Sequence, residues 1–205
     1  MARRSDHSRE QLYALALGAA ERIVEADGLR RLTARNVADA IGYSPGTLYN
    51  VFENLDDLIL HLNAHTLDLL YEALSQAPVS GAPDRDIDVL LEGYLEFLPD
   101  HPGLWTALFE YVRPDGAGLP DWYQLKITRV LGLLEAALAP LFGGEETDQL
   151  THAARVLWAG LHGIYALEAG GKLDVVSNDT FRDMARTLTR TYLAGLRHGA
   201  REAGQ

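Results

Sequence analysis

Polar side chains that could contact nucleic acid are concentrated between residues 44 and 50. Thr47, Tyr49 and Asn50 carry hydroxyl, phenol and amide groups, whereas Leu48 and Phe52 would face a core, because residues four apart share one side of a helix. Hydroxyl groups bind phosphates, and an asparagine can make two parallel hydrogen bonds to adenine. The residues therefore predict a short helix with one buried face and one face free to contact DNA.

Two helices joined by a tight turn would position these groups. Thr33 is a good N-cap for a first helix of about two turns, and Gly42 can take the left-handed conformation that ends it. Ser44 and Pro45 suit the N-cap and the first position of a second helix, which we expect to run to about Phe52. The pattern predicts a helix-turn-helix, with which many proteins read DNA, and the alternative is a helical pair used only for packing.

The same stretch resembles the TetR family of bacterial transcription regulators. A helix expected from Ser8 to Asp27 lies upstream, and another begins near Asn54. The resemblance implies a transcriptional regulator that binds a palindromic operator as a homodimer, acts by default as a repressor and is released by a small-molecule effector. The family's pattern is matched in order and without a gap by Thr33, Val37, Ala38, Gly42, Ser44, Gly46, Thr47, Leu48, Tyr49 and Phe52.

The resemblance also implies which residues contact double-stranded DNA. Thr33, Thr47 and Tyr49 would bind phosphates. Arg35, Pro45 and Asn50 would lie near base edges, where arginine can read guanine and asparagine adenine. The expected DNA-binding set is Thr33, Arg35, Ser44, Pro45, Gly46, Thr47, Tyr49 and Asn50.

The chain departs from the family's usual pattern at two places. Leu55, followed by Asp56 and Asp57, stands where the family usually has a lysine that grips a phosphate. Asn50 and Val51 stand where an aromatic residue and a histidine are common, so the base preferences of better-known members do not transfer. One alternative is therefore a member that has lost DNA binding and pairs with another regulator, although the intact helix-turn-helix residues argue against it.

The charge distribution explains how an acidic chain could bind DNA. The 205 residues carry a formal net charge of -11, yet seven arginines and six acidic residues nearly balance in residues 1–50. Local arginines and helix N-termini would supply the phosphate contacts, and nonspecific binding should be weak. Arg3, Arg4 and Arg9 could form an arm that reaches the minor groove, or they could belong to a solvated terminus.

The remainder of the chain reads as helical, so the expected fold is all-α. We expect a three-helix DNA-binding domain in residues 1–54 and a larger helical domain for effector binding and dimerisation in residues 55–205. Proline and glycine separate its segments. The expected helices run from Leu55 to about Ser75, Asp84 to Leu98, His101 to Val112, Asp121 to Leu138, Glu145 to Ala169 and Asn178 to Arg201.

Trp158, His162 and Gly163 resemble a TetR subgroup marked by a Trp-His-Gly signature. In the family, the last two long helices pack against those of a second subunit as a four-helix bundle. A single-chain core could use the same residues. The candidates for this surface are Leu150, Ala154, Leu157, Leu161, Tyr192, Leu193 and Leu196.

Aromatic residues between positions 94 and 165 could line an apolar cavity for an apolar or aromatic effector. The alternative is core packing, which is the commoner role of an aromatic residue at helical spacing. The candidates that we single out are Trp105, Phe109, Tyr123, Trp158 and His162.

The main alternative from another class is a metal-dependent enzyme. His61 and His65 are four residues apart on one expected helix, but Leu62 occupies the position at which zinc peptidases carry a glutamate. Cysteine is absent, which excludes zinc–cysteine sites and thiolate catalysis. We expect no enzymatic activity, no cofactor, no bound metal and no membrane span, and hence a soluble cytoplasmic protein.

Overall fold

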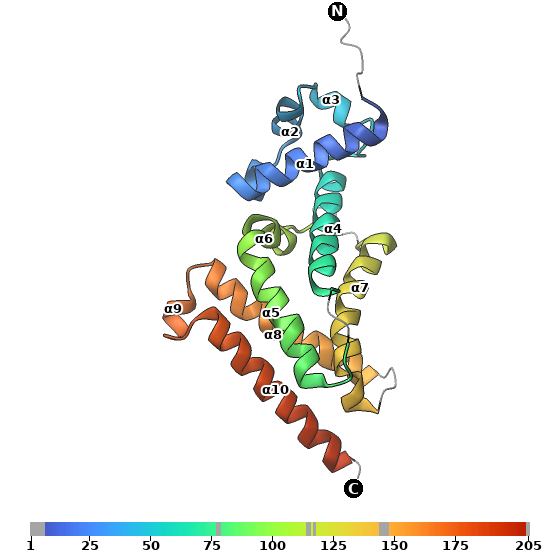
Figure 1. Ribbon diagram of the computed structural model, residues 1–205. Helices are drawn as coiled ribbons and strands as arrows, with labels where there is room; N and C mark the ends of the chain where they lie inside the picture. The colour runs from blue at the N-terminus through green and yellow to red at the C-terminus, as the bar shows by residue number, and fades with distance from the viewer. Residues whose placement is uncertain (1–6, 77–78, 114–115, 117, 144–147, 204–205) are drawn as a thin grey trace, which may run out of the picture. The chain divides into compact units, whose positions relative to one another are not determined.

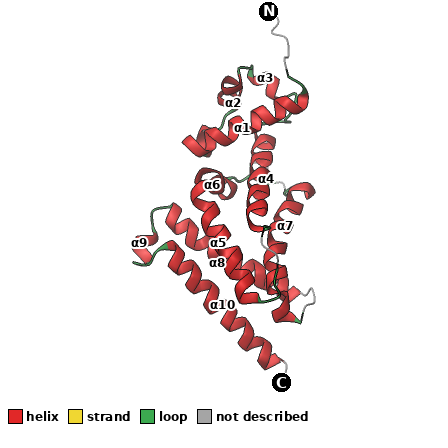
Figure 2. Ribbon diagram, in the orientation of Figure 1, coloured by secondary structure: helices red, strands yellow, loops and turns green. Residues whose placement is uncertain are grey.

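The computed structural model describes residues 7–76, 79–113, 116, 118–143 and 148–203. Every regular element in these residues is a helix, as Figure 2 shows. The expected all-α class is therefore confirmed. Within the same residues, no helix is both long enough and apolar enough to cross a membrane.

The N-terminal part contains α1 (Arg9–Asp27), the short 3-10 helix η1 (Leu29–Arg31), α2 (Ala34–Ile41) and α3 (Pro45–Leu48), and Figure 1 shows α2 and α3 beside α1. Ser8 and Gln11 form a reciprocal capping box at the start of α1, and Gly28 ends it with φ 77°. The expected Ser8–Asp27 helix is confirmed. Arg9 is the first residue of α1, so its place in an arm was wrong, whereas Arg3 and Arg4 lie outside the described residues.

The described parts of the long helices that follow agree with expectation to within a few residues, and the expected start at Glu145 lies outside the described residues. Pro99 lies inside α5, where we expected it to end the helix. Proline has no N–H for the carbonyl four residues earlier, and the Leu95 carbonyl accepts a hydrogen bond from the Arg182 side chain at 2.9 Å instead. The two short elements η2 and α9 were not expected. The elements are α4 (Leu55–Leu74), α5 (Pro83–Asp100), α6 (Pro102–Glu110), α7 (Asp121–Leu138), η2 (Ala139–Phe142), α8 (Asp148–Ala169), α9 (Leu173–Val176) and α10 (Phe181–Ala203).

The chain divides into two compact units. The first unit takes residues 1–68 and 101–124, and the second takes residues 69–100 and 125–205. Helices α4 and α7 each continue from one unit into the other, and α6 belongs to the unit that contains the helix-turn-helix. Compactness and function are different criteria, so the functional boundary after residue 54 stays a prediction.

In the second unit α10 packs against α8 and α5. Leu157 is 1% exposed within one chain, and the Tyr192 hydroxyl donates to the Ala153 carbonyl at 3.0 Å. The alternative of a single-chain core is therefore correct for most of the proposed dimer residues, because α8 and α10 turn their apolar faces toward each other. The buried members of that set are Leu150, Ala154, Leu157, Leu161 and Leu193.

Candidate nucleic-acid interface

Thr33 caps the first helix of the pair. Its backbone is extended, and its Oγ1 accepts a hydrogen bond from the Asn36 amide at 3.1 Å. The Asn36 side chain in turn donates to the Arg31 carbonyl at 2.8 Å, which connects the cap to η1. The expected N-cap is confirmed. Because its oxygen serves as an acceptor here, the Thr33 hydroxyl keeps its own hydrogen for a phosphate.

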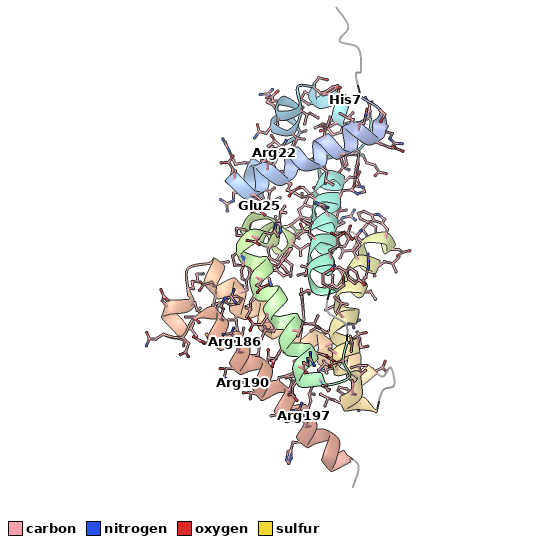
Figure 3. The ribbon with its side chains drawn as sticks, in the orientation of Figure 1. His7, Arg22, Glu25, Arg186, Arg190 and Arg197 are labelled. Carbon is pink, nitrogen blue, oxygen red and sulfur yellow. The ribbon has the colours of Figure 1, made fainter. Side chains whose placement is uncertain are left out.

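The turn between the helices has the expected geometry. Gly42 lies in the left-handed region with φ 75° and ψ 27°, and the Tyr43 amide donates to the Ala38 carbonyl at 2.9 Å. The Tyr43 hydroxyl lies 2.6 Å from Nδ1 of His7, a residue just before α1. Figure 3 labels His7 at this end of α1. The turn is thereby connected to the start of the chain as well as to α2.

Helix α3 is shorter than expected. It ends at Leu48, and Tyr49 already has ψ 0°. The next residues continue as tight turns, since the Asn50 amide donates to the Thr47 carbonyl at 3.2 Å and the Val51 amide to Leu48 at 3.0 Å. The expectation of a helix to Phe52 was therefore wrong in its length, although these turns keep Leu48 and Phe52 on the inner side.

Ser44 occupies the N-cap position of α3 but does not cap with its side chain. Its Oγ lies 3.0 Å from Oγ1 of Thr47, and its carbonyl accepts from the Thr47 amide at 2.9 Å. Pro45 has no amide hydrogen, which reduces the number of donors that need a partner. The two hydroxyls thus form a linked polar pair at the beginning of the helix.

The buried and exposed faces of this segment divide as the sequence predicts. Leu48 and Phe52 are each 2% exposed, whereas the Tyr49 side chain is 52% exposed. Thr47 is half-buried. The other residues of the expected DNA-binding set, on α2, on α3 and beside them, are exposed: Thr33, Arg35, Ser44, Pro45, Gly46 and Asn50.

The two acidic residues that follow Leu55 have contacts of their own. Asp57 Oδ2 accepts from the Glu53 amide, while the Asp57 amide donates to Asn54 Oδ1, each at 2.9 Å. This exchange caps α4. Asp56 Oδ1 accepts from the Tyr111 hydroxyl at 2.8 Å. The Asn-x-x-Asp spacing resembles a capping box and is the sequence signal that we missed.

His61 and His65 do not converge on a metal site. His61 Nε2 lies 3.6 Å from Asp57 Oδ1, its Nδ1 lies 3.1 Å from the Tyr13 hydroxyl, and its ring stacks on Trp122. His65 Nε2 lies 3.7 Å from Glu21 instead. Within the residues that the structure describes, no group of three histidine, aspartate or glutamate side chains is arranged to hold a metal ion.

The expected effector residues are divided between the two units. Trp105, Phe109 and Tyr123 belong to the first unit, where the Trp105 and Phe109 rings lie 5.1 Å apart. Burial raises the pKa of Tyr123 to about 12. Trp158 and His162 lie on α8 in the second unit, and burial lowers the pKa of His162.

Of these five residues, only Trp158 lines a cavity described within the second unit. The cavity is lined by apolar side chains of α4, α5, α7 and α8, and the Tyr94 ring is centred 5.8 Å from that of Trp158. Its volume of about 20 Å³ is room for little more than one water molecule. An effector would have to displace side chains to enter.

A short second helix with a buried apolar face and an exposed polar face, held by a left-handed glycine turn, defines a helix-turn-helix DNA-binding protein. Residues 16–62 match the family described as bacterial regulatory proteins, tetR family. Residues 87–192 match the tetracyclin repressor-like C-terminal domain, which covers half of the chain. The chain belongs to the TetR family of transcriptional regulators.

Individual proteins agree with this assignment. The chain is 28% identical over 201 residues to an uncharacterized HTH-type transcriptional regulator of Mycobacterium tuberculosis, covering 97% of this chain and 88% of the relative. A Rhodococcus protein of unknown function has a similar structure, with TM-score 0.72, 23% identity and coverage of 95% of this chain and 99% of that one.

Two further solved structures share the fold. BioQ, solved with its double-stranded DNA operator, has TM-score 0.59 and 22% identity, covering 94% of this chain and 99% of BioQ. Thermus thermophilus FadR, a TetR family repressor solved with lauroyl-CoA, has TM-score 0.59 and 18% identity, covering 91% of this chain and 93% of FadR. At these identities the likeness establishes the fold alone.

Proposed function

We propose that this regulator is a cytoplasmic repressor that binds a palindromic operator as a homodimer and leaves it when a small apolar or aromatic molecule binds. The observation that carries the DNA-binding part is the exposed polar side of α3, seated on the buried Leu48 and Phe52. Residues 1–54 act as the DNA-binding domain, and residues 55–205 bind the effector and form the dimer. The Trp-His-Gly subgroup is part of the same proposal.

The proposed contacts follow the geometry of the segment. Thr33, Thr47 and Tyr49 bind phosphates, with Ser44 and the backbone at Gly46 supporting the same contact. Arg35 and Asn50 read base edges beside Pro45. Asp56 and Asp57 are engaged by Tyr111 and by the cap of α4, so their charges are directed to protein donors. We therefore propose that DNA affinity survives the missing lysine.

Dimerisation is proposed because one reading helix contacts only a few base pairs, and two-fold pairing on a palindrome adds the affinity that one helix lacks. Most of the dimer residues expected from the sequence are buried within one chain, so the outward side of α8 is the better candidate. Val156, Ala159, Gly163 and Ala166 lie on this side at helical spacing; Gly163 and the two alanines are exposed, and Val156 is 42% exposed.

Effector binding is proposed at the cavity beside Trp158, which has apolar walls. FadR of similar fold was solved with an acyl-CoA, which supports an apolar ligand in this kind of fold. The effector acts by favouring one of two arrangements of the dimer. Trp158→Ala should change the concentration at which a releasing compound acts and leave operator affinity in its absence unchanged.

Two other functions receive less support. An enzyme of the metal-dependent class would need His61 and His65 together, but they contact separate carboxylates. A family member that has lost DNA binding and pairs with another regulator should lack the residues that contact DNA. Here Tyr49 and Asn50 are present and exposed.

The experiment that tests the proposal is binding to DNA that flanks the protein's own gene, at near-physiological salt. Wild type should bind selectively, and Tyr49→Ala should lose selective binding while keeping its helix content. Val175→Ala is the matched control, because Val175 is 85% exposed on α9 in the second unit. Selective binding by Tyr49→Ala would contradict the assigned surface, and binding by neither protein would contradict the proposed function.

A further inference from the structure

The first turn of α6 is capped by a residue of another helix. His101 occupies the N-cap position but makes no side-chain capping bond, and Pro102 has no amide hydrogen. The next two amides donate to Glu25 of α1, from Gly103 to Oε2 at 2.9 Å and from Leu104 to Oε1 at 3.1 Å. We call this contact the Glu25 cap. Figure 3 labels Glu25 in α1, close to α6.

The charge and the geometry both favour this cap. The N-terminus of a helix carries a partial positive charge, so a carboxylate that accepts two amides there is bound more tightly than a neutral acceptor. His101 Nδ1 lies 4.0 Å from Glu25 Oε1, beyond hydrogen-bond distance, so the cap rests on the two backbone amides. Because α6 has no cap of its own, it depends on α1 to satisfy these amides.

Gly103 brings the two backbones into direct contact. A Cβ at this position would lie 2.6 Å from the Val24 carbonyl oxygen and 2.7 Å from the Glu25 Cα. Both atoms belong to the α1 backbone and cannot move aside as a side-chain end would. A glycine is therefore required for α6 to approach closely enough for the Glu25 carboxylate to reach both amides.

The Glu25 cap lies where the chain enters the first unit. The chain passes between the two units within α4, within α7 and at His101. The first two crossings are inside helices, whereas His101 has φ -134° and ψ 48° and separates α5 from α6. On the other side of the cap, α1 ends two residues after Glu25 and leads through η1 to Thr33, the first proposed phosphate contact.

We propose that Glu25 is a positioning residue for operator binding: by capping α6 it holds α1, and with it the start of α2, in the arrangement that fits DNA. Loss of the cap lowers operator affinity. A conformational change that reaches α6 through His101 breaks the cap and thereby releases α2 and α3 from the operator. This inference rests on the proposed operator binding and specifies how that binding is regulated.

The first test compares operator affinity among variants at the end of α1. Glu25→Ala should weaken binding by about fivefold or more, the lower limit of typical coupling between sites. Glu25→Gln keeps an acceptor oxygen and should restore part of the affinity. Asp27→Ala is the matched control, since it also removes one negative charge from the last turn of α1 and is exposed. Equal affinities for Glu25→Ala and Asp27→Ala would overturn the proposal.

The second test uses reciprocity, because a cap that strengthens operator binding must itself be strengthened by the operator. Hydrogen exchange should be measured for the peptide that contains the Gly103 and Leu104 amides. Saturating operator should slow their exchange in wild type by about fivefold or more. In Glu25→Ala the same amount of bound operator should leave the exchange unchanged. A purely structural cap would show no response to DNA in wild type, and that outcome would overturn the proposal.

Gly103→Ala provides an independent variant that leaves the carboxylate in place. Its Cβ forces α6 away from α1, so it should reproduce the loss of affinity seen in Glu25→Ala. Gly18→Ala is the control within the same unit, because its Cβ would meet only the Arg22 guanidinium at 3.6 Å. Unweakened binding by Gly103→Ala would contradict the proposal, and absence of binding by wild type would instead refute operator binding itself.

Discussion

Ser44 Oγ and Thr47 Oγ1 lie 3.0 Å apart at the beginning of α3. The bond fixes both hydroxyls before any DNA is present, and the Thr47 amide is held by the Ser44 carbonyl at 2.9 Å. A donor whose rotamer is already set loses less conformational entropy when it binds a phosphate. We therefore expect the pair to contribute more to the proposed phosphate contact than to folding, since Ser44 is exposed and Thr47 is half-buried.

Thr47→Val tests this division between recognition and folding. Valine keeps the shape of the side chain and removes the hydroxyl. We expect operator affinity to fall roughly tenfold, which corresponds to about 1.5 kcal/mol for a hydrogen bond to a charged group. The free energy of unfolding should change by less than about 1 kcal/mol. Anisotropy titration and urea denaturation measure the two quantities. Thr187→Val, at an exposed position of α10, should change neither.

Replacing either of two glycines in the helix-turn-helix by alanine should change the free energy of unfolding, but in opposite directions. Gly42 has φ 75°, so Gly42→Ala should lower the free energy of unfolding by about 1–2 kcal/mol. At Gly46 the nearest neighbour of a new Cβ is Ser44 Oγ at 3.9 Å. Gly46→Ala should therefore raise the free energy of unfolding by about 0.5–1 kcal/mol.

The same Gly46→Ala variant should bind operator more weakly, because a methyl group would separate the α3 backbone from the phosphate. Thermal or urea unfolding and operator titration of one preparation give both values. A variant that is more stable and binds equally well would show that DNA does not approach this backbone.

The parts of the fold that the sequence predicted are those with local signals. Thr33, Gly42 and Pro45 each act on neighbouring backbone, so the helix starts and the turn could be placed from residue type alone. The Glu25 cap could not be predicted, because Glu25 and Gly103 are far apart in the chain. No residue pattern near either position indicates that the two are in contact.

Helical periodicity likewise identifies an apolar face and does not identify what covers it. Leu157 and Leu193 were correctly expected to be buried, but their partners lie in the same chain rather than in a second subunit. The expected effector residues had the same weakness. Aromatic spacing could not foretell that Trp105 and Trp158 would belong to different compact units.

The outward face of α8 gives a direct test of dimerisation. A Cβ at Gly163 would meet nothing within 4 Å in one chain, so Gly163→Arg should leave the protomer folded. If this face forms the dimer, the variant should be a monomer by light scattering at concentrations at which wild type is a dimer. Leu157→Ala is the contrasting variant, which should lower the free energy of unfolding by about 2–5 kcal/mol because it opens a cavity inside the chain. A dimeric Gly163→Arg would exclude this face.

Tyr123 should make folding sensitive to alkaline pH. Its side chain is 4% exposed, and burial raises its pKa to about 12 from the ordinary 10.0. The folded state therefore holds the phenol proton more tightly than the unfolded state does. The contribution of this group is complete below pH 10 and is lost as the pH rises from about 10 to about 12, by at most about 2–3 kcal/mol.

Tyr123→Phe removes the titrating proton and keeps the ring, so the free energy of unfolding should fall less steeply with pH between 10 and 12 than in wild type. Urea denaturation across this range measures the slope. Trp122→Phe is the control, because it alters the neighbouring ring, 5.8 Å from Tyr123, without removing a titrating group. Identical slopes for wild type and Tyr123→Phe would mean that the phenol is solvated in the folded protein, and the burial of this residue in the first turn of α7 would then be wrong.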